Sequence, residues 1–430
     1  MNIIITEQAQ QQNLGIESAP HLHARMTTNM IMGITFIAML PAAIAFYYYT
    51  GFGFVWQFLI SYATAAVCEI LVALLRHRPV LSGVGNFSAA VTCLIMAFTL
   101  PPLLPWYLTC AATVFAILLV KEAFGGLGMN IFNPAMAGFI FLFVSASGFM
   151  FRTWVVPVDD ACAVLTPSAT MEVIFDGKSP LELKSLLREQ EPNDQETKKQ
   201  SNAKGKGASY TEGSDANGDA FDAKPDSTGG ATLNSADGTS GATATGSDAT
   251  SGASAKALDG RSGATMLEKV KSSRKSGNKD LSEILGDLDR TPYIWIACMF
   301  ALGGIALMIL RIIIVKMALA FFIGIALFSG IGHMLWPELI MPVTDQILLG
   351  GTAICGFFII TDPVTNAGTS KGRIAFALLC ALLIVAIRAL GSYSDSVAFS
   401  VMLSNAAAPL IDVLTRRRAF GHGYKKGELE

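Results

Sequence analysis

The segments "FSAAVTCLIMAFTLPP" at residues 87–102 and "QILLGGTAICGFFIITDPV" at residues 346–364 decide the fold of this chain. Each is an apolar run of about 14–15 residues that stops at a proline phrase, where a membrane-spanning helix needs about 20. Thr99 and Thr361 align at one constant offset, and the cysteines and prolines of the two runs share it. Short, proline-interrupted segments at matching positions are typical of an inverted-repeat membrane fold. Coincidence is the alternative, but the spacing and the number of elements favour a repeat.

The composition and the longer apolar runs around these segments indicate a membrane protein. Of the 430 residues, 52% are hydrophobic and 15% are charged, whereas ordinary soluble domains carry about 25% charged residues. Apolar runs longer than about 18 residues predict membrane-spanning helices. Together with the two short segments they give ten elements, at 27–49, 52–75, 87–100, 106–124 and 132–147, and then at 292–315, 316–335, 346–360, 374–390 and 394–414.

Five elements in each half place the halves in opposite orientations, because an odd number of crossings leaves the chain on the other side of the membrane. The predicted fold is therefore an all-α polytopic membrane protein of about ten transmembrane elements. It is built as two inverted five-helix repeats with an extracytoplasmic insert. The N-terminal segment, first repeat, insert, second repeat and C-terminal tail are predicted at 1–26, 27–149, 150–290, 291–415 and 416–430.

Basic residues predict the orientation. They gather in alternate loops and at both ends, while the opposite short loops hold few, with Arg388 as the main exception. The positive-inside rule then places both termini in the cytoplasm and the insert on the outer side. Within the insert, residues 190–257 are rich in Ser, Gly, Ala, Thr and Asp, and we expect them to be disordered. The basic residues that set the orientation are Arg25, Arg76, Arg78, Lys121, Arg311, Lys316, Lys371, Arg373, Arg416, Arg417, Arg418, Lys425 and Lys426.

The phrase "DGRSGAT" at residues 259–265 follows this low-complexity tract. One interpretation is a turn and a helix start, in which Ser262 or Thr265 caps the helix and Thr265 forms a capping box with Glu268. That interpretation needs no ligand. The same features suit an anion, because glycines allow a close backbone approach and a helix N-terminus offers free N–H groups. A threonine hydroxyl there could carry a phosphoester.

This phrase resembles the flavinylation motif of the RnfD/NqrB family of membrane flavoproteins, which belong to two related redox pumps. RnfD is part of the Rnf electron transport complex, and NqrB is part of the sodium-pumping NADH:quinone reductase. Met266 stands where the family motif has proline. Similarity to RnfD also extends through the stretches at 19–32, 78–92, 99–108, 125–138 and 358–373. NqrB has a different, longer N-terminal region, so the resemblance favours RnfD.

The resemblance implies a covalent cofactor. In the family, a flavin transferase joins FMN through a phosphoester to the threonine of the motif, and some members carry a second, non-covalent flavin. A second phrase, which contains Thr170, lacks the Asp-Gly and Ser-Gly pairs, so Thr265 ranks ahead of Thr170. The predicted cofactor-binding residues are Thr265, as the phosphoryl-linked threonine, with Asp259, Gly260, Ser262, Gly263 and Ala264.

The resemblance further implies an electron-transfer component that is not catalytic alone. The Rnf complex of the bacterial inner membrane moves electrons between ferredoxin and NAD and couples this to Na⁺ or H⁺ transport. Expected partners are the flavoprotein RnfG, membrane subunits A and E, soluble subunits B and C, the flavin transferase and membrane lipid. The net charge of -2 offers no basic footprint for nucleic acid, and the seven cysteines form no CxxC pair, so no metal site is predicted.

Two alternatives remain open at this stage. The chain could be the NqrB component of a sodium-pumping NADH:quinone reductase. It could also be a solute channel, because an inverted repeat with short broken helices is a transporter architecture, similar to the urea-transporter fold, and fold does not fix function. A channel has no use for a flavin-attachment phrase, and this feature favours the electron carrier.

Several residues carry predictions of their own. The glycines of 125–128 are expected to form a tight turn, followed by Asn133 as a helix N-cap with Pro134 behind it. Asp362 is either a solvated loop charge or a contact for an ion path or a flavin. Glu69 lies near the end of an apolar run and is expected to snorkel to the interface.

Overall fold

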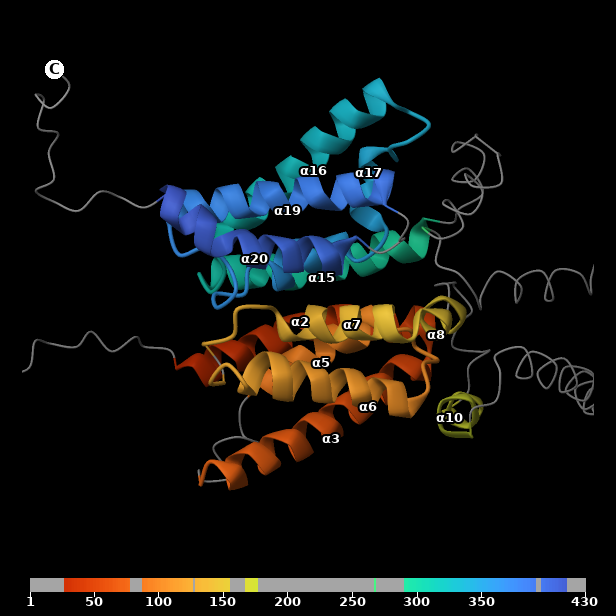
Figure 1. The fold of residues 1–430 in the computed structure, drawn as a ribbon. Coiled ribbons are helices and arrows are strands. Elements are labelled where there is room, and N and C mark those ends of the chain that lie inside the picture. The colour runs from red at the N-terminus through yellow and green to blue at the C-terminus, as the bar shows by residue number, and fades with distance from the viewer. Residues whose placement is uncertain are drawn as a thin grey trace, which may run out of the picture. The chain divides into compact units, whose positions relative to one another are not determined.

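Every regular element that the structure describes is a helix, as the sequence predicts (Figure 1). The structure is a computed structural model that describes residues 27–77, 87–126, 128–154, 167–176, 267, 290–391 and 396–415. The low-complexity tract at 190–257 and the phrase at 259–265 lie outside these residues. The described residues belong to one unit, which comprises Met1–Gly177 and Arg261–Glu430.

The first group of helices follows the predicted order. The fourth predicted element is continuous helix, but its second part is a π-helix, η1, that extends α6. A short helix, α10, follows this group and packs against α3. The elements are α2 (Thr28–Thr50), α3 (Phe52–Leu75), α5 (Phe87–Thr99), α6 (Trp106–Val114), η1 (Phe115–Glu122), α7 (Pro134–Ser145), α8 (Ser147–Arg152) and α10 (Pro167–Asp176).

The second group contains one element that differs from its predicted form. The run expected at 346–360 is broken by a turn at Gly350 and Gly351, and its first helical part begins at Val343. The glycines take positive φ angles of 66° and 72°, which other residues rarely adopt, and this stops the helix. The elements are α15 (Thr291–Ile309), α16 (Val315–Leu335), α17 (Val343–Leu348), α18 (Thr352–Ile354), the π-helix η2 (Cys355–Ile359), α19 (Ser370–Leu390) and α20 (Val397–Thr415).

Six of these helices are long and apolar enough to cross a membrane, by length and composition: α2, α3, α15, α16, α19 and α20. Helices α5 and α7 are apolar but shorter, with 13 and 12 residues. Large apolar side chains such as Ile37, Val67 and Ile309 are exposed on the long helices. Water would penalise such a surface, whereas lipid does not. The prediction of a polytopic membrane protein is therefore confirmed.

Helices of the first group pack against helices of the second group in two places. Helix α2 contacts α15, and α7 contacts α20 (Figure 1). Within the groups, α3 packs on α6 and α16 packs on α19. The crossing of α2 and α15 depends on Gly303, because a Cβ there would overlap the carbonyl oxygen of Ala38. Small residues of this kind let helix backbones approach closely in membranes.

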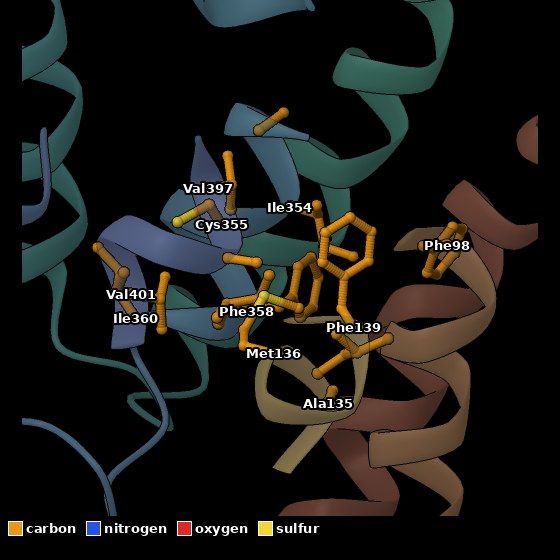
Figure 2. Close-up of a cluster of buried hydrophobic side chains, with 14 of the residues drawn as sticks. Phe98, Ala135, Met136, Phe139, Ile354, Cys355, Phe358, Ile360, Val397 and Val401 are labelled. Carbon is orange, nitrogen blue, oxygen red and sulfur yellow. The ribbon is translucent and has the colours of Figure 1, made fainter. Parts of the chain in front are cut away.

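The core includes the short helix α5 and the broken α17–η2 element. Figure 2 shows Phe139 of α7 near Phe358 of η2, with Met136 and Ile354 beside them and Phe98 of α5 farther away. Phe300 of α15 connects them, since its ring centroid lies 4.9 Å from that of Phe98 and 6.1 Å from that of Phe358. Aromatic packing at these distances adds to the stability gained by burial. The broken segments are therefore held inside the protein.

Candidate functional site

The six predicted flavin-site residues, at 259, 260 and 262–265, lie outside the described residues. Leu267 is the nearest described residue of that segment. It is helical and buried, with 6% of its surface exposed. Its Cδ1 lies 2.5 Å from where a Cβ on Gly350 would stand. The chain two residues after Thr265 is therefore in contact with the turn that breaks the second-group element.

The second-ranked threonine is enclosed by the protein. Thr170 lies on α10 with none of its surface exposed, and its hydroxyl donates to the carbonyl oxygen of Pro167 over 3.1 Å. The helix is held against α3, where the rings of Phe175 and Trp56 meet at 5.7 Å. A phosphoester on Thr170 would require this packing to open. Thr170 is therefore poorly placed for modification, whereas Thr265 lies outside the described residues.

A buried arginine organises the Gly350 turn. Arg388 of α19 has 4% of its surface exposed, although it lies in an apolar helix. Its guanidinium donates to carbonyl, amide and hydroxyl oxygens at 2.7 to 3.1 Å, most of them on residues 346–352, which run from α17 through the turn to the start of α18. A planar fork of five N–H groups suits several acceptors held in fixed positions. The acceptors are Gln346 O and Oε1, Leu349 O, Gly350 O, Thr352 Oγ1 and Ser396 Oγ.

An ion pair fixes the beginning of the same element. Asp345 of α17 is buried and accepts two hydrogen bonds from Arg290, at 2.8 Å from Nε and 3.2 Å from Nη2. This fork-to-carboxylate geometry is stronger than a single hydrogen bond. The hydrogen bonds to Asp345 raise the pKa of Arg290 further, so the guanidinium stays charged at physiological pH. Arg290 is the N-cap of α15, and the pair therefore ties the start of α15 to α17.

The loop after η2 carries Asp362, one of the predicted candidates. Its carboxylate accepts hydrogen bonds from the Val364 N–H and the Thr365 hydroxyl, both at 3.3 Å. Desolvation raises the pKa of the Asp362 carboxyl above its usual value, and these two hydrogen bonds act in the opposite direction. The side chain is half-buried and shapes its own loop. It is therefore not a freely solvated charge. Among the described residues, its side-chain hydrogen bonds are to its own loop, and none of them identifies an ion path or a flavin contact.

The same loop joins the two groups of helices through Asn405 of α20. With its amide oriented to satisfy both neighbours, Asn405 donates to Thr365 O and accepts from the Asn133 N–H, each at 3.1 Å. Asn133 caps α7 by accepting from the N–H groups of Ala135 and Met136, and Pro134 follows it. The predicted cap is confirmed. The bridge through Asn405 was not predicted, because no local pattern connects residues so far apart in sequence.

Glu69 forms a second buried charge cluster, and the prediction that it snorkels is wrong. Its carboxylate accepts a hydrogen bond from Lys121 Nζ at 2.7 Å, and the two residues are 6% and 4% exposed. Lys121, counted among the basic loop residues, instead belongs to the last turn of η1. Nearby, Arg76 pairs with Glu122 at 3.2 Å. Two ion pairs therefore join the end of α3 to the end of η1.

The glycine turn after η1 has the predicted form. Gly125, Gly126 and Gly128 have φ angles of 119°, 98° and 96°, which favour glycine strongly. The turn leads from η1 toward the cap of α7. No contact of the described residues assigns it a ligand.

These features define a polytopic helical membrane protein whose two groups of helices each hold a broken or shortened element and a buried cation. The chain belongs to the NQR2, RnfD, RnfE family, which it matches over residues 15–421. It is similar to bacterial proteins that are named as the D subunit of the ion-translocating oxidoreductase complex. The Tolumonas auensis protein is 30% identical over 95% of this chain and 100% of its own length. The Sodalis glossinidius protein is 32% identical over 95% and 99%, and the Escherichia fergusonii protein 29% over 95% and 98%.

Proposed function

We propose that this chain is the RnfD membrane component of an Rnf-type ion-translocating oxidoreductase complex and takes part in electron transport. The observation that carries the proposal is the family match over residues 15–421, which includes both groups of helices and the phrase at 259–265. Relatives that bear the name of the D component are covered from end to end or nearly so. NqrB of the quinone reductase is the alternative within the same family, and partner dependence separates the two.

Within that role, Thr265 is the proposed attachment point of FMN, through a phosphoester on its hydroxyl. FMN supplies one- and two-electron redox chemistry, and the protein supplies position and electrostatics. Asp259, Gly260, Ser262, Gly263 and Ala264 form the phrase that a flavin transferase reads. The buried hydroxyl of Thr170 supports this choice, because that residue is unsuited to modification. A second, non-covalent flavin is part of the proposal only as a family property.

We propose ten membrane elements in two inverted halves. The packing of α2 on α15 and of α7 on α20 supports this, since corresponding elements meet in pairs. The shortened α5 and the broken α17–η2 element occupy matching positions. Basic residues still favour cytoplasmic termini after Lys121 is removed from the loop count. The segment that carries Thr265 then lies on the outer side of the inner membrane.

The proposed partners follow from a chain that relays electrons without completing a reaction. The flavoprotein RnfG would exchange electrons on the outer side, membrane subunits A and E would lie beside the helices, and soluble subunits B and C would act in the cytoplasm. Coupling to Na⁺ or H⁺ transport belongs to the assembled complex. The urea-transporter-like channel is the competing function, and it predicts no covalent flavin.

The test is covalent flavin on a defined peptide. The full chain is expressed with its flavin transferase, denatured, examined for in-gel fluorescence and digested for mass spectrometry. We expect a fluorescent band and an FMN-sized adduct on the peptide that contains Thr265. Thr265→Ala should remove the adduct, while Thr170→Ala, the matched control, should keep it. An unmodified chain in the presence of an active transferase would falsify the proposed function.

A further inference from the structure

The strongest feature that the proposed function leaves unused is the contact between Leu267 and the Gly350 turn. Leu267 is buried to 6% exposure although it belongs to the segment that carries the flavin phrase. Its Cδ1 would stand 2.5 Å from a Cβ on Gly350, and Arg388 Nη2 would stand 2.6 Å from the same Cβ. Gly350 therefore leaves space that both side chains use.

The turn beneath Leu267 is held firmly by the rest of the helical domain. Arg388 donates to the carbonyl oxygens of Leu349 and Gly350 at 2.9 and 3.1 Å. The Thr352 hydroxyl donates to Gln346 O at 2.7 Å across the same turn. Because the carbonyl oxygens of Gln346, Leu349 and Gly350 all accept hydrogen bonds, the turn presents a well-defined surface. Since Arg388 ties this turn to α19, an apolar side chain that packs on the turn has a fixed position relative to α19.

We propose that Leu267 is a positioning residue that docks the segment carrying Thr265 onto the Gly350–Arg388 turn. The proposal rests on the proposed function for the role of Thr265, but the docking contact stands independently of flavin. Two residues of chain span at most about 7 Å, so docking at 267 limits how far the residue-265 backbone can move from this turn. The docked Leu267 thereby limits the distance between the attachment residue and the turn that Arg388 organises.

The contact itself is tested by labelling. Leu267→Cys, in the full chain within its complex in native membranes, is treated with a water-soluble maleimide. Modification is measured peptide by peptide by mass spectrometry, so the native cysteines remain. Asp176→Cys, at the exposed end of α10, is the accessible control. We expect Leu267→Cys to react at about one tenth of the rate of Asp176→Cys or more slowly still, because undocking must precede labelling.

The double variant Leu267→Cys with Gly350→Ala decides whether the turn provides the protection. The added methyl group would collide with the docked side chain, and labelling should then approach that of Asp176→Cys. Only Gly350→Ala chains that still assemble into the complex are included in the comparison, so that misfolded chains do not contribute to the labelling. If Leu267→Cys and Asp176→Cys are labelled at equal rates, the docking is overturned. Slow labelling that Gly350→Ala leaves unchanged overturns it as well, because the shield would then lie elsewhere.

The positioning role is tested by a measurement that would not change if the contact only stabilised the fold. Leu267→Asp and its conservative partner Leu267→Met are compared for covalent flavin per chain and for the rate of flavin reduction in the assembled complex. We expect both to keep the flavin, the Asp variant to be reduced about tenfold more slowly, and the Met variant to behave as the unmodified chain. An unchanged rate in the Asp variant overturns the positioning role. Absence of flavin from the unmodified chain overturns the proposed function, while the maleimide result still decides the contact.

Discussion

Each group of helices contains a buried cation, and the two cations have different structural roles: one stabilises a helix–helix contact and the other stabilises a loop. Lys121 of η1 faces one carboxylate, that of Glu69 on α3, at 2.7 Å. Arg388 of α19 spreads its hydrogen bonds over carbonyl, amide and hydroxyl oxygens of the Gly350 turn, of the two helix ends beside it and of Ser396. The lysine therefore joins two helices through one charge pair, whereas the arginine shapes a loop through geometry. The comparison shows that a basic residue in an apolar run is no guide by itself to the structure around it.

The largest effect is expected from breaking the lysine pair alone. Lys121→Met leaves the Glu69 carboxylate buried without its partner, and such a change typically costs about 3–5 kcal/mol. The midpoint of thermal unfolding in detergent should fall markedly. The double variant Glu69→Gln with Lys121→Met removes both charges and should recover most of the loss. If the single and double variants are equally unstable, the charge pair is not what holds α3 to η1.

A smaller but more specific effect is expected at the arginine. Arg388→Lys keeps the charge, but an ammonium group cannot reach the same set of acceptors. We expect a loss of about 1–3 kcal/mol, the typical cost of one buried acceptor left without its donor. The Gly350 turn should loosen, which protease sensitivity between α17 and α18 measures. Lys121→Arg is the matched exchange in the other group, and it should leave that turn intact. A turn as resistant in Arg388→Lys as in the unmodified chain contradicts a geometric role.

The helices themselves were largely predictable, because their signals are local. Apolar runs, the prolines after α5 and η2, and the Asn133–Pro134 cap lie within the segments that they shape. The partners of buried polar groups were not predictable. Glu69 and Lys121 lie 52 residues apart and Arg388 and Gln346 lie 42 apart, so only folding reveals the pairs. In the sequence, Arg388 stands out only as an exception to the charge pattern, which does not name its partners. The flavin phrase stays a sequence prediction, since it lies outside the described residues.

A neutral counterpart of the arginine sharpens the comparison further. Gln57 of α3 donates to the carbonyl oxygens of Pro102 and Leu104, at 3.3 and 2.7 Å, and so holds the loop between α5 and α6. Gln57→Met should cost about 1–2 kcal/mol, because fewer acceptors lose a donor and none of the bonds involves a charge. Thermal unfolding alongside Arg388→Lys measures the difference. A loss at Gln57 as large as that at Arg388 would mean that charge contributes little to holding these loops.

The smallest effect is expected at the helix caps that flank the junction between the groups. Asn133 caps α7 and Thr369 caps α19 by accepting from the Gly372 N–H at 2.9 Å. Replacing either by alanine should cost about 1 kcal/mol. Asn133→Ala should cost slightly less than Thr369→Ala, because the Asn133 N–H that binds Asn405 remains, whereas the Thr369 hydroxyl also meets that of Thr415. Thermal midpoints of the two variants, with Asn405→Ala as reference, test this order. If Asn133→Ala proves as damaging as Asn405→Ala, the cap inside α7 contributes as much stability as the bridge that joins the two groups of helices.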